Sequence, residues 1–264
     1  MALLNSFNSG VSAVKTFGKS LEVIGDNIAN VNSTGFKGSR VTNQDNFSQT
    51  LQEASVSTTG TSSNATQIGS GTSVASISQQ FTQGILSTTG SPTDLGISGK
   101  GFFEVKDSTG NLFYTRAGDF RLDANGNLLT NGGLNVQDKA GTNVAITTPA
   151  TVASFKVNKD GSIDVARLDG TVTKGISTIG LFSFANPNGL KREGDNLLSN
   201  FTTTAGAKEP NATSDIIQGT LELSNVDLTQ QFSDLIVAQR AFQAGSRVIT
   251  VSDSVMEEIV NLKR

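Results

Sequence analysis

Apolar residues at the start of the chain recur at the spacing of an amphipathic helix. Their steps alternate between three and four residues, as in a heptad, along Leu4, Phe7, Val11, Val14, Leu21 and Ile28. Two positions of the same heptad, Gly18 and Gly25, are glycines. Since glycine inside a helix costs about 1 kcal/mol relative to alanine, glycines on this stripe indicate that a neighbouring backbone comes close. A tolerated, slightly frayed helix is the alternative.

The end of the chain predicts a second, longer helix. Asp227 stands at the N-cap position with Gln230 three residues later, close to the pattern of a capping box. A heptad follows along Leu228, Leu235, Phe242, Ile249 and Met256, with Phe232 and Val260 on adjoining positions. A helix over residues 227–262 would be roughly 50 Å long at 1.5 Å per residue. A second partial stripe runs along Val248, Val255, Ile259 and Leu262, and two apolar faces imply more than one packing partner.

Between the helices, short alternating runs predict an antiparallel β-rich domain. The runs are separated by the motifs DSTGN, DANGN, DKAGT, NKDGS and RLDG, whose glycines suit hairpin turns with positive φ. Within DANGN, a type I′ turn is expected at Asn125–Gly126. The predicted strands cover residues 102–106, 112–116, 120–123, 152–157, 163–166 and 176–184. Their regular short spacing favours a sandwich or barrel over βαβ units.

The segment before this domain has no such pattern. Residues 55–66, SVSTTGTSSNAT, are polar and of low complexity. Because they cannot bury a core, we expect a flexible linker or loop there. The alternative is a segment that becomes ordered against neighbouring molecules.

Composition removes most kinds of chemistry. The chain of 264 residues has no His, Cys or Trp, so imidazole bases, thiolate nucleophiles and ordinary zinc sites are absent. The net charge of −3 offers no basic face for nucleic acid, and Lys37 and Arg40 are expected on a solvated face. No stretch reaches the roughly 20 apolar residues of a membrane span, and no cleavable signal peptide is visible. We therefore expect no catalytic, cofactor or metal site, no small-molecule substrate and no membrane insertion.

The two terminal helices must bury their apolar stripes. They can pair within one molecule, or they can pack between copies of the chain. The double stripes, the polar residues that interrupt them and the helical glycines favour packing between copies. Contacts of that kind are heterologous, and a head-to-tail interface whose rotation does not close gives a helical filament.

Residues 9–40 carry a family resemblance. Their sequence, SGVSAVKTFGKSLEVIGDNIANVNSTGFKGSR, closely resembles the N-terminal signature of the bacterial flagellar rod and hook protein family, although Asp26 stands where asparagine is commonest. The resemblance continues in order through FTQGILSTTGSPTDLGISGKGFFEV, YTRAGDFRLDANGNLLTNGG, FANPNGLKREGDNLL and QGTLELSNVDLTQQFSDLIVAQRAFQAGSRVI. It covers nearly the whole chain.

The resemblance implies a structural protein of the flagellum that self-assembles into a tube transmitting motor torque for motility. It implies an α+β fold whose terminal helices, residues 1–31 and 225–264, form an inner coiled-coil layer. Extended connecting segments, 32–75 and 200–224, lead to a β-rich outer domain, 76–199. Members of the family are exported by the flagellar type III apparatus without a cleaved signal and polymerise under a cap. The implied partners are further copies, the cap, junction proteins and neighbouring rod or hook proteins.

Two sets of residues are expected to carry assembly. We expect the polymerisation interface at Leu4, Phe7, Val11, Val14, Leu21, Ile28, Leu228, Phe232, Leu235, Phe242, Ile249 and Met256. The turn from the inner helix into the outer layer resembles the junction of the family at Asn27, Asn30, Gly35 and Phe36. Asparagine side chains can cap helix ends, Gly35 would permit a chain reversal, and Phe36 would anchor it.

The choice between hook and rod depends on length and local sequence. Many hook proteins of the family carry a further outer domain, for which 264 residues leave no room, and this suits a distal rod protein or a short hook form. Distal rod proteins can also carry an extra segment near residues 47–66. However, SQTLQEAS, QIGSGTSVASI and the ending VNLKR look more like hook proteins. The preferred interpretation is therefore the flagellar hook, outside the cell, with the distal rod of the basal body, in the periplasm, as the alternative.

A protein of another class is also compatible with the pattern. An extracellular β domain on a helical stalk could act as a monomeric module that binds glycan or peptide. The aromatic content of 6% weakens glycan binding, which relies on aromatic stacking. An enzyme of unknown type is the third alternative, and no motif supports it.

Overall fold

The computed structural model describes residues 2–56, 62–146, 152–200, 203–210 and 214–262, and it describes their side chains except those of residues 2–4, 55–56, 62–63 and 203. The chain divides into two compact units. The helical unit comprises residues 1–29, 39–79 and 227–264, and the β unit comprises residues 30–38 and 80–226. The chain therefore crosses between the units at 29–30, 38–39, 79–80 and 226–227.

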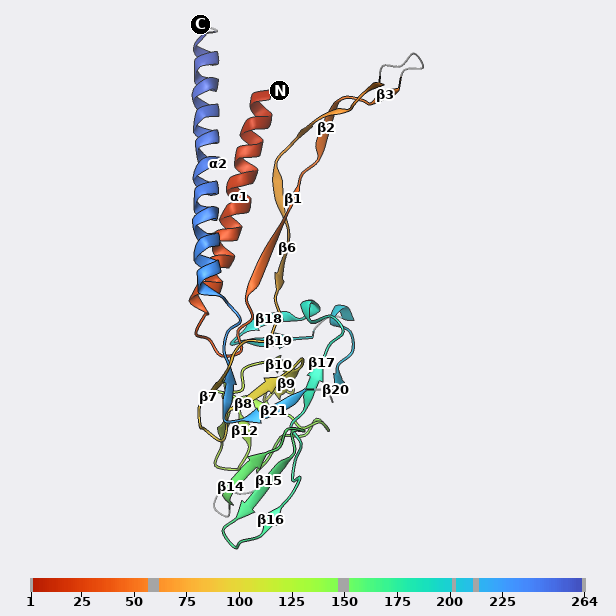
Figure 1. Ribbon diagram of the computed structural model, residues 1–264, viewed down its shortest axis with the longest axis vertical. Coiled ribbons are helices and arrows are strands. Elements are labelled where there is room, and N and C mark those ends of the chain that lie inside the picture. Colours follow the sequence, from red (N-terminus) through yellow and green to blue (C-terminus); the bar gives the residue numbers. More distant parts are fainter. Residues whose placement is uncertain (1, 57–61, 147–151, 201–202, 211–213, 263–264) are drawn as a thin grey trace. The chain divides into compact units, whose positions relative to one another are not determined.

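Two long helices lie side by side in the helical unit (Figure 1). Helix α1 spans Ala2–Ala29 and helix α2 spans Leu228–Leu262, close to the two helices that the heptads predict. The predicted N-cap of α2 is confirmed, because Asp227 Oδ1 accepts hydrogen bonds from the backbone N–H groups of Thr229 at 2.8 Å and Gln230 at 3.4 Å.

A two-stranded antiparallel ribbon completes the helical unit. Its pairs are β1 (Ser39–Asp45) with β6 (Thr72–Gln79), β2 (Ser48–Gln52) with β5 (Thr66–Gly69), and β3 (Ser55–Val56) with β4 (Ser62–Ser63). Strands β1 and β6 contact α1. The expected linker at 55–66 is thus partly strand, since residues 55–56, 62–63 and 66 belong to the ribbon, while residues 57–61 lie outside the described residues.

The β unit is built on an antiparallel sheet of nine strands. Seven of them follow the order β11-β12-β13-β9-β10-β19-β18, and β17 joins β9 to β20. Their bounds are β9 (Phe102–Lys106), β10 (Leu112–Thr115), β11 (Arg121–Leu122), β12 (Leu128–Leu129), β13 (Asn135–Val136), β17 (Leu181–Ser183), β18 (Lys191–Gly194), β19 (Leu197–Ser199) and β20 (Glu209–Pro210). Of the strand predicted over 176–184, only residues 181–183, towards its end, form a strand, β17.

Smaller antiparallel pairs complete the β unit. Strands β14 (Val152–Val157), β15 (Ile163–Arg167) and β16 (Val172–Thr173) form a three-stranded sheet. Strand β8 (Leu95–Ser98) pairs with β21 (Asp215–Gln218), and β7 (Leu86–Thr88) pairs with β22 (Thr220–Glu222). The last strands show that the described part of 200–224 is not only a connecting segment, because β21 and β22 return into the β unit.

Both faces of the central sheet are covered, which explains why the four successive β9 residues 102–105 are all buried, Glu104 included. Successive side chains of a strand point to opposite faces. Phe102 accordingly joins one buried cluster with Tyr114 and Phe182, whereas Phe103 joins the other with Phe120. The larger cluster is completed by residues such as Leu95, Ile97, Val105, Leu128, Val136, Val144, Ile146, Ile163, Val165 and Ile216. The predicted α+β class, with two terminal helices and antiparallel sheets, is confirmed.

The hairpin motifs form turns with a glycine in the left-handed region, as expected. In DANGN, Gly126 has φ +83° and donates its N–H to Asp123 O at 2.8 Å, but Asn125 has no positive φ. The type I′ prediction at Asn125–Gly126 is therefore wrong, because a type I′ turn needs positive φ at both central residues. That combination occurs instead between β18 and β19, where Asp195 and Asn196 have φ of 53° and 57°.

Candidate assembly surface and junction

Helices α1 and α2 pack antiparallel (Figure 1), so the pairing within one molecule that the sequence left open as the less favoured alternative does occur. A Cβ on Gly10 would lie 3.1 Å from Ile249 Cγ1, and a Cβ on Gly245 would lie 3.1 Å from Val14 Cγ2. Glycine therefore lets the helices approach at these two positions. The expectation of close approach at Gly18 and Gly25 is wrong within the described chain: a Cβ on Gly18 would meet only Phe242 at 3.8 Å, and one on Gly25 would meet no atom within 4 Å.

The residues expected at a polymerisation interface fall into two groups. Half-buried in the helical unit are Val11, Val14, Leu21, Ile28, Leu235, Phe242 and Ile249. Exposed on its surface are Phe7, Leu228, Phe232 and Met256. The side chain of Leu4 lies outside the described ones. The first group takes part in packing within the molecule and is partly accessible, the second group is exposed, and the role of both groups in polymerisation stays a prediction.

Helix α2 exposes more apolar side chains than the heptad predicts. Together with Leu228, Phe232 and Met256, the exposed set comprises Ile236, Val237, Val248, Val251, Ile259, Val260 and Leu262, and we call these ten residues the α2 surface. Ile236, Val237 and Val251 were missed because they lie on neither predicted stripe. Exposed apolar patches on soluble proteins mark interaction sites.

The side chain of Asn27 links three segments of the helical unit by hydrogen bonds. Its Nδ2 donates to Ser39 O at 2.8 Å and to Gln231 Oε1 at 2.9 Å, and its Oδ1 accepts from Ser39 N at 2.8 Å. The side chain is buried. The predicted junction residue Asn27 thus connects the end of α1, the start of β1 and the first turn of α2.

The other predicted junction residues lie in the β unit. Asn30 O and Oδ1 accept hydrogen bonds from the N–H and hydroxyl of Ser33, both at 3.1 Å, which forms the turn after α1. Phe36 is 1% exposed, and the guanidinium of Arg192 lies 5.2 Å from the centre of its ring. Gly35 has φ +66° and donates its N–H to Glu222 O at 2.8 Å. The chain thus has a positive φ at Gly35 and a buried side chain at Phe36, while the role of these residues in a family junction stays a prediction.

Gly35→Ala is expected to lower the free energy of unfolding of the β unit by roughly 2–3 kcal/mol. A Cβ there would lie 2.5 Å from Ala117 N, and positive φ alone costs an L-residue about 1–2 kcal/mol. Gly90→Ala is the matched control, because Gly90 has φ +75° but no atom within 4 Å of an added Cβ. Tyr114, the single Tyr of a chain without Trp, lets urea unfolding of the β unit be followed by fluorescence. Equal losses in the two variants would show that the contact with Ala117 has no effect.

Three charged side chains meet in the interior of the β unit beside this turn. Lys37 Nζ lies 2.7 Å from Glu222 Oε1, and Arg116 Nη1 lies 3.0 Å from Glu222 Oε2. All three residues are buried, so the expectation that Lys37 lies on a solvated face is wrong, although it holds for Arg40. We call Lys37, Arg116 and Glu222 the buried ion cluster. Sequence reasoning missed Arg116 and Glu222, because nothing local distinguishes a buried charge from an exposed one.

The carboxylate of Glu222 accepts several hydrogen bonds in this cluster. Besides the two cations, its carboxylate accepts the backbone N–H of Gly84 at 2.8 Å. Lys37 Nζ also donates to Thr82 O at 2.8 Å, and Arg116 Nη2 donates to Gly99 O at 2.8 Å. Burial lowers the pKa of Lys37 below its ordinary value, opposed by the hydrogen bond and charge of Glu222 and assisted by the charge of Arg116. One carboxylate thus pairs with two buried cations.

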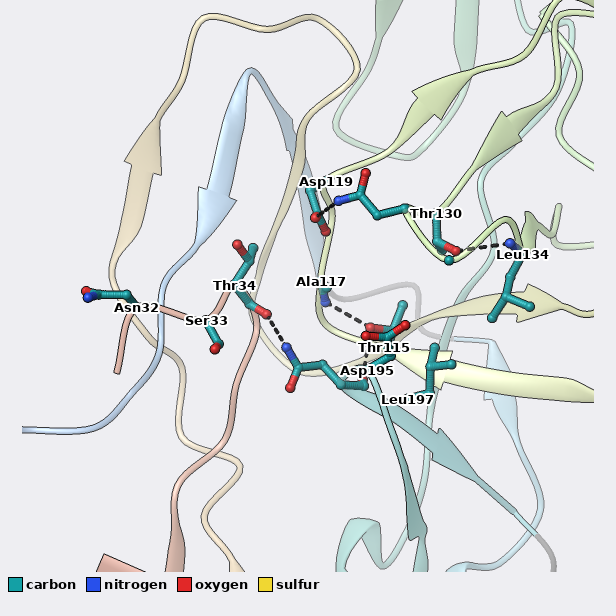
Figure 2. Close-up of a pocket in the computed structure, with 13 residues that line it drawn as sticks. Asn32, Ser33, Thr34, Thr115, Ala117, Asp119, Thr130, Leu134, Asp195 and Leu197 are labelled. Atoms are coloured by element: carbon teal, nitrogen blue, oxygen red, sulfur yellow. Dashed lines mark hydrogen bonds between the residues drawn. The ribbon is translucent and has the colours of Figure 1, made fainter. Parts of the chain in front are cut away.

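A polar pocket of about 580 Å³ opens elsewhere in the β unit (Figure 2). It is lined by residues 32–34, 115, 117, 119, 130–132, 134 and 195–197. Asn196 Nδ2 donates to Thr34 O at 2.8 Å, and Thr115 Oγ1 donates to Asn196 O at 3.1 Å. Asn131 donates to the carboxylate of Asp119. Burial raises the pKa of Asp119 above its ordinary 3.8, assisted by Asp94 and opposed by Asn131 and Arg121.

Asp119→Asn is expected to be more stable, relative to the wild type, at pH 7 than at pH 3. Because the folded chain holds the Asp119 proton to a higher pH than the unfolded chain does, this contribution is present in acid and is lost as the pH rises through the raised pKa. Urea unfolding at both pH values measures the difference. Asp195→Asn, at an exposed carboxylate of the same pocket, is the control. A relative stability that does not change with pH would contradict the expectation.

Neither a metal-binding group of side chains nor a membrane-spanning helix is found among the described residues. No group of three or more acidic side chains among them is arranged to hold a metal ion. None of the described helices is long and apolar enough to cross a membrane.

Comparisons with known proteins agree with an axial flagellar subunit. Three stretches match families described as "Flagella basal body rod protein" (residues 7–37), "Flagellar hook protein FlgE/F/G D1 domain" (96–165) and "Flagellar basal body rod FlgEFG protein C-terminal" (217–262). The chain is similar to the flagellar basal-body rod protein FlgG of Bacillus subtilis (strain 168), with 42% identity over 99% of this chain and 100% of the relative.

A single organism provides a comparison of rod and hook. The flagellar basal-body rod protein FlgG of Borreliella burgdorferi (strain ATCC 35210 / DSM 4680 / CIP 102532 / B31) is 32% identical over 92% of this chain and 93% of the relative. The flagellar hook protein FlgE of the same strain is 26% identical, over 99% of this chain and 100% of the relative. The hook alignment extends over 445 residues, against 264 in this chain, so it contains large gaps. The comparisons favour rod over hook, in contrast to the preference that the short hook-like motifs gave.

Proposed function

Because this chain belongs to the family of flagellar rod and hook proteins, we propose that it is a distal rod protein, a subunit that self-assembles into a tube transmitting torque from the motor. The family is structural, not enzymatic, and its proteins polymerise in the axis of the flagellum. The observation that carries the proposal is the end-to-end similarity to a basal-body rod protein, 42% identical over 99% of this chain.

The α2 surface supports burial between copies. The two helices pair within the molecule and still leave ten large apolar residues of α2 exposed, which supports further packing of this helix between copies. In the proposed tube, residues 1–31 and 225–264 form the inner layer, 32–75 and 200–224 connect the layers, and 76–199 form the outer layer. Further copies, a cap, junction proteins and neighbouring axial proteins are the proposed partners.

The ribbon of the helical unit supports a stiff rod. A two-stranded ribbon has no core of its own and is only marginally stable alone. Phe47 is 82% exposed, Leu51 is 59% exposed and Ile68 is 46% exposed. We propose that these side chains pack on neighbouring copies, which would resist sliding between subunits. A hook must bend while it rotates, so its outer contacts have to slide between near-equal packings.

Electron microscopy of polymers grown from the purified chain tests the proposal. A distal rod protein is expected to give straight, stiff tubes, whereas curved tubes would identify a hook protein. A chain that stays monomeric at high concentration would favour the binding module instead. In Phe47→Ser/Leu51→Ser, tubes are expected to form but to bend more, and Gln49→Ser, at an exposed polar position of β2, is the control. If the double variant gave tubes as straight as those of the wild type, the exposed side chains of the ribbon would not be the cause of stiffness.

A further inference from the structure

One asparagine side chain in each unit holds the backbone at a crossing between the units. Asn27 does so in the helical unit, where both its amide oxygen and its amide nitrogen bind Ser39. Asn225 does so in the β unit, one residue before the last residue of that unit. A side-chain amide can donate two hydrogen bonds and accept others. It can therefore bind an unpaired backbone segment with the same hydrogen bonds that a neighbouring strand would form.

Asn225 joins three chain segments of the β unit. Its Oδ1 accepts from Gly38 N at 2.9 Å, and its Nδ2 donates to Gln80 O at 2.7 Å. The same Nδ2 lies 2.8 Å from Thr82 Oγ1. Gln80 N in turn donates to Gly38 O at 2.8 Å. Gly38 and Gln80 are the β-unit residues of the crossings at 38–39 and 79–80. Both are thus hydrogen-bonded to Asn225, which lies just before the crossing at 226–227.

The two asparagines act on consecutive residues. Gly38 is the last residue of its segment in the β unit, and Ser39 is the first residue of the next segment in the helical unit. Both backbone polar groups of Gly38 are bound within the β unit, to Asn225 and Gln80. Both backbone polar groups of Ser39 are bound within the helical unit, to Asn27. Because Gly38 and Ser39 are adjacent, no residue without such bonds separates the two sets.

We propose that Asn27 and Asn225 are positioning residues that clamp Gly38 and Ser39. While these hydrogen bonds hold, the chain at this crossing can change conformation only by rotation about its backbone torsions. Each clamp consists of side-chain hydrogen bonds to the backbone, and their loss opens the backbone locally without removing the core of either unit. The benefit of such a clamp to a subunit under torque rests on the proposed function; the clamp itself does not.

Hydrogen exchange of the full-length monomer tests the clamps separately. In Asn225→Ala the Gly38 amide is expected to exchange at least tenfold faster, and in Asn27→Ala the Ser39 amide is expected to do so, because each loses its acceptor. The Val105 amide, in the core strand β9, should change less than twofold in both. Asn188→Ala and Asn8→Ala, at exposed asparagines of the same two units, are the matched controls.

Trypsin gives a second readout at the crossing. Lys37 is buried and held by its ion pair, so cleavage after it needs local opening. The double variant Asn27→Ala/Asn225→Ala is expected to be cut after Lys37 roughly 100-fold faster than the wild type, since it loses the hydrogen bonds of both clamps. Mass spectrometry of the fragments distinguishes this cut from cleavage after the exposed Arg40.

Conservative variants keep the test decisive where alanine prevents folding. Asn225→Asp and Asn27→Asp retain an acceptor oxygen but lose the donor, so the Gly38 and Ser39 amides should stay protected to within about threefold. Unchanged exchange in both alanine variants would overturn the proposal, and so would an equal acceleration at Gly38 and Val105, which would mean global unfolding. Since all readouts come from the monomer, they stand whether or not the chain builds a rod.

Discussion

Glu222→Gln is expected to lower the free energy of unfolding of the β unit by roughly 3–5 kcal/mol, the range for removing one partner from a buried ion pair. Glutamine keeps the shape of the side chain but removes the single negative charge that pairs with Lys37 and Arg116, both of which are buried. Two buried cations would then lie close together without a counter-charge. Tyr114 fluorescence during urea unfolding reports this loss, because no Trp is present and no other Tyr exists.

Two further variants separate charge balance from general damage. Lys37→Met leaves Arg116 and Glu222 as a balanced pair, so its loss is expected to be clearly smaller than that of Glu222→Gln. Glu209→Gln changes an exposed carboxylate of the same unit and should stay within about 0.5 kcal/mol of the wild type. If Lys37→Met were as damaging as Glu222→Gln, charge balance would not be the reason for the cluster.

The cluster also predicts an alkaline signature. Because the pKa of Lys37 is lowered in the fold, the folded chain binds fewer protons than the unfolded chain between that lowered value and the ordinary 10.5. The contribution of Lys37 to stability therefore increases as the pH rises through this window. Lys37→Met should lack this increase.

Phe232→Asp is expected to abolish polymers while leaving the monomer folded. Phe232 is 51% exposed on α2, so the substitution changes the free energy of unfolding of the monomer little. Burying a phenylalanine side chain contributes about 1.5–3 kcal/mol, and a buried aspartate adds a desolvation cost. The concentration needed for polymerisation should therefore rise at least tenfold per interface.

Sedimentation and electron microscopy measure this effect, and circular dichroism checks the helices of the monomer. Ser233→Asp places the same charge on the neighbouring exposed position and is the control. Leu235→Asp is also expected to abolish polymers and to leave the β unit folded, but Leu235 is half-buried, so the helical unit should be weakened as well. Normal polymers from Phe232→Asp would exclude this part of the α2 surface from assembly.

Local features of the chain were predictable because they depend on neighbours in sequence. The heptads gave the lengths of α1 and α2, and Asp227 gave the start of α2. Strands β9 and β14 begin and end at the predicted residues, and the glycine of each hairpin motif has the expected positive φ. The type I′ turn at Asn125–Gly126 failed because an Asn-Gly pair also suits a type I turn followed by a left-handed glycine, and the pairing of the flanking strands decides between them.

Residues far apart in sequence meet only through the tertiary structure, and their roles could not be predicted from local pattern. Lys37 and Glu222 are 185 positions apart, and Asn225 and Gly38 are 187 apart. A heptad likewise cannot distinguish Leu235, half-buried against the rest of its unit, from Phe232, left exposed, because both kinds of burial require the same apolar side chains. The periodicity of a sequence predicts which apolar side chains need to be buried. Tertiary packing decides which of them remain exposed in the monomer and which charged side chains are buried away from solvent.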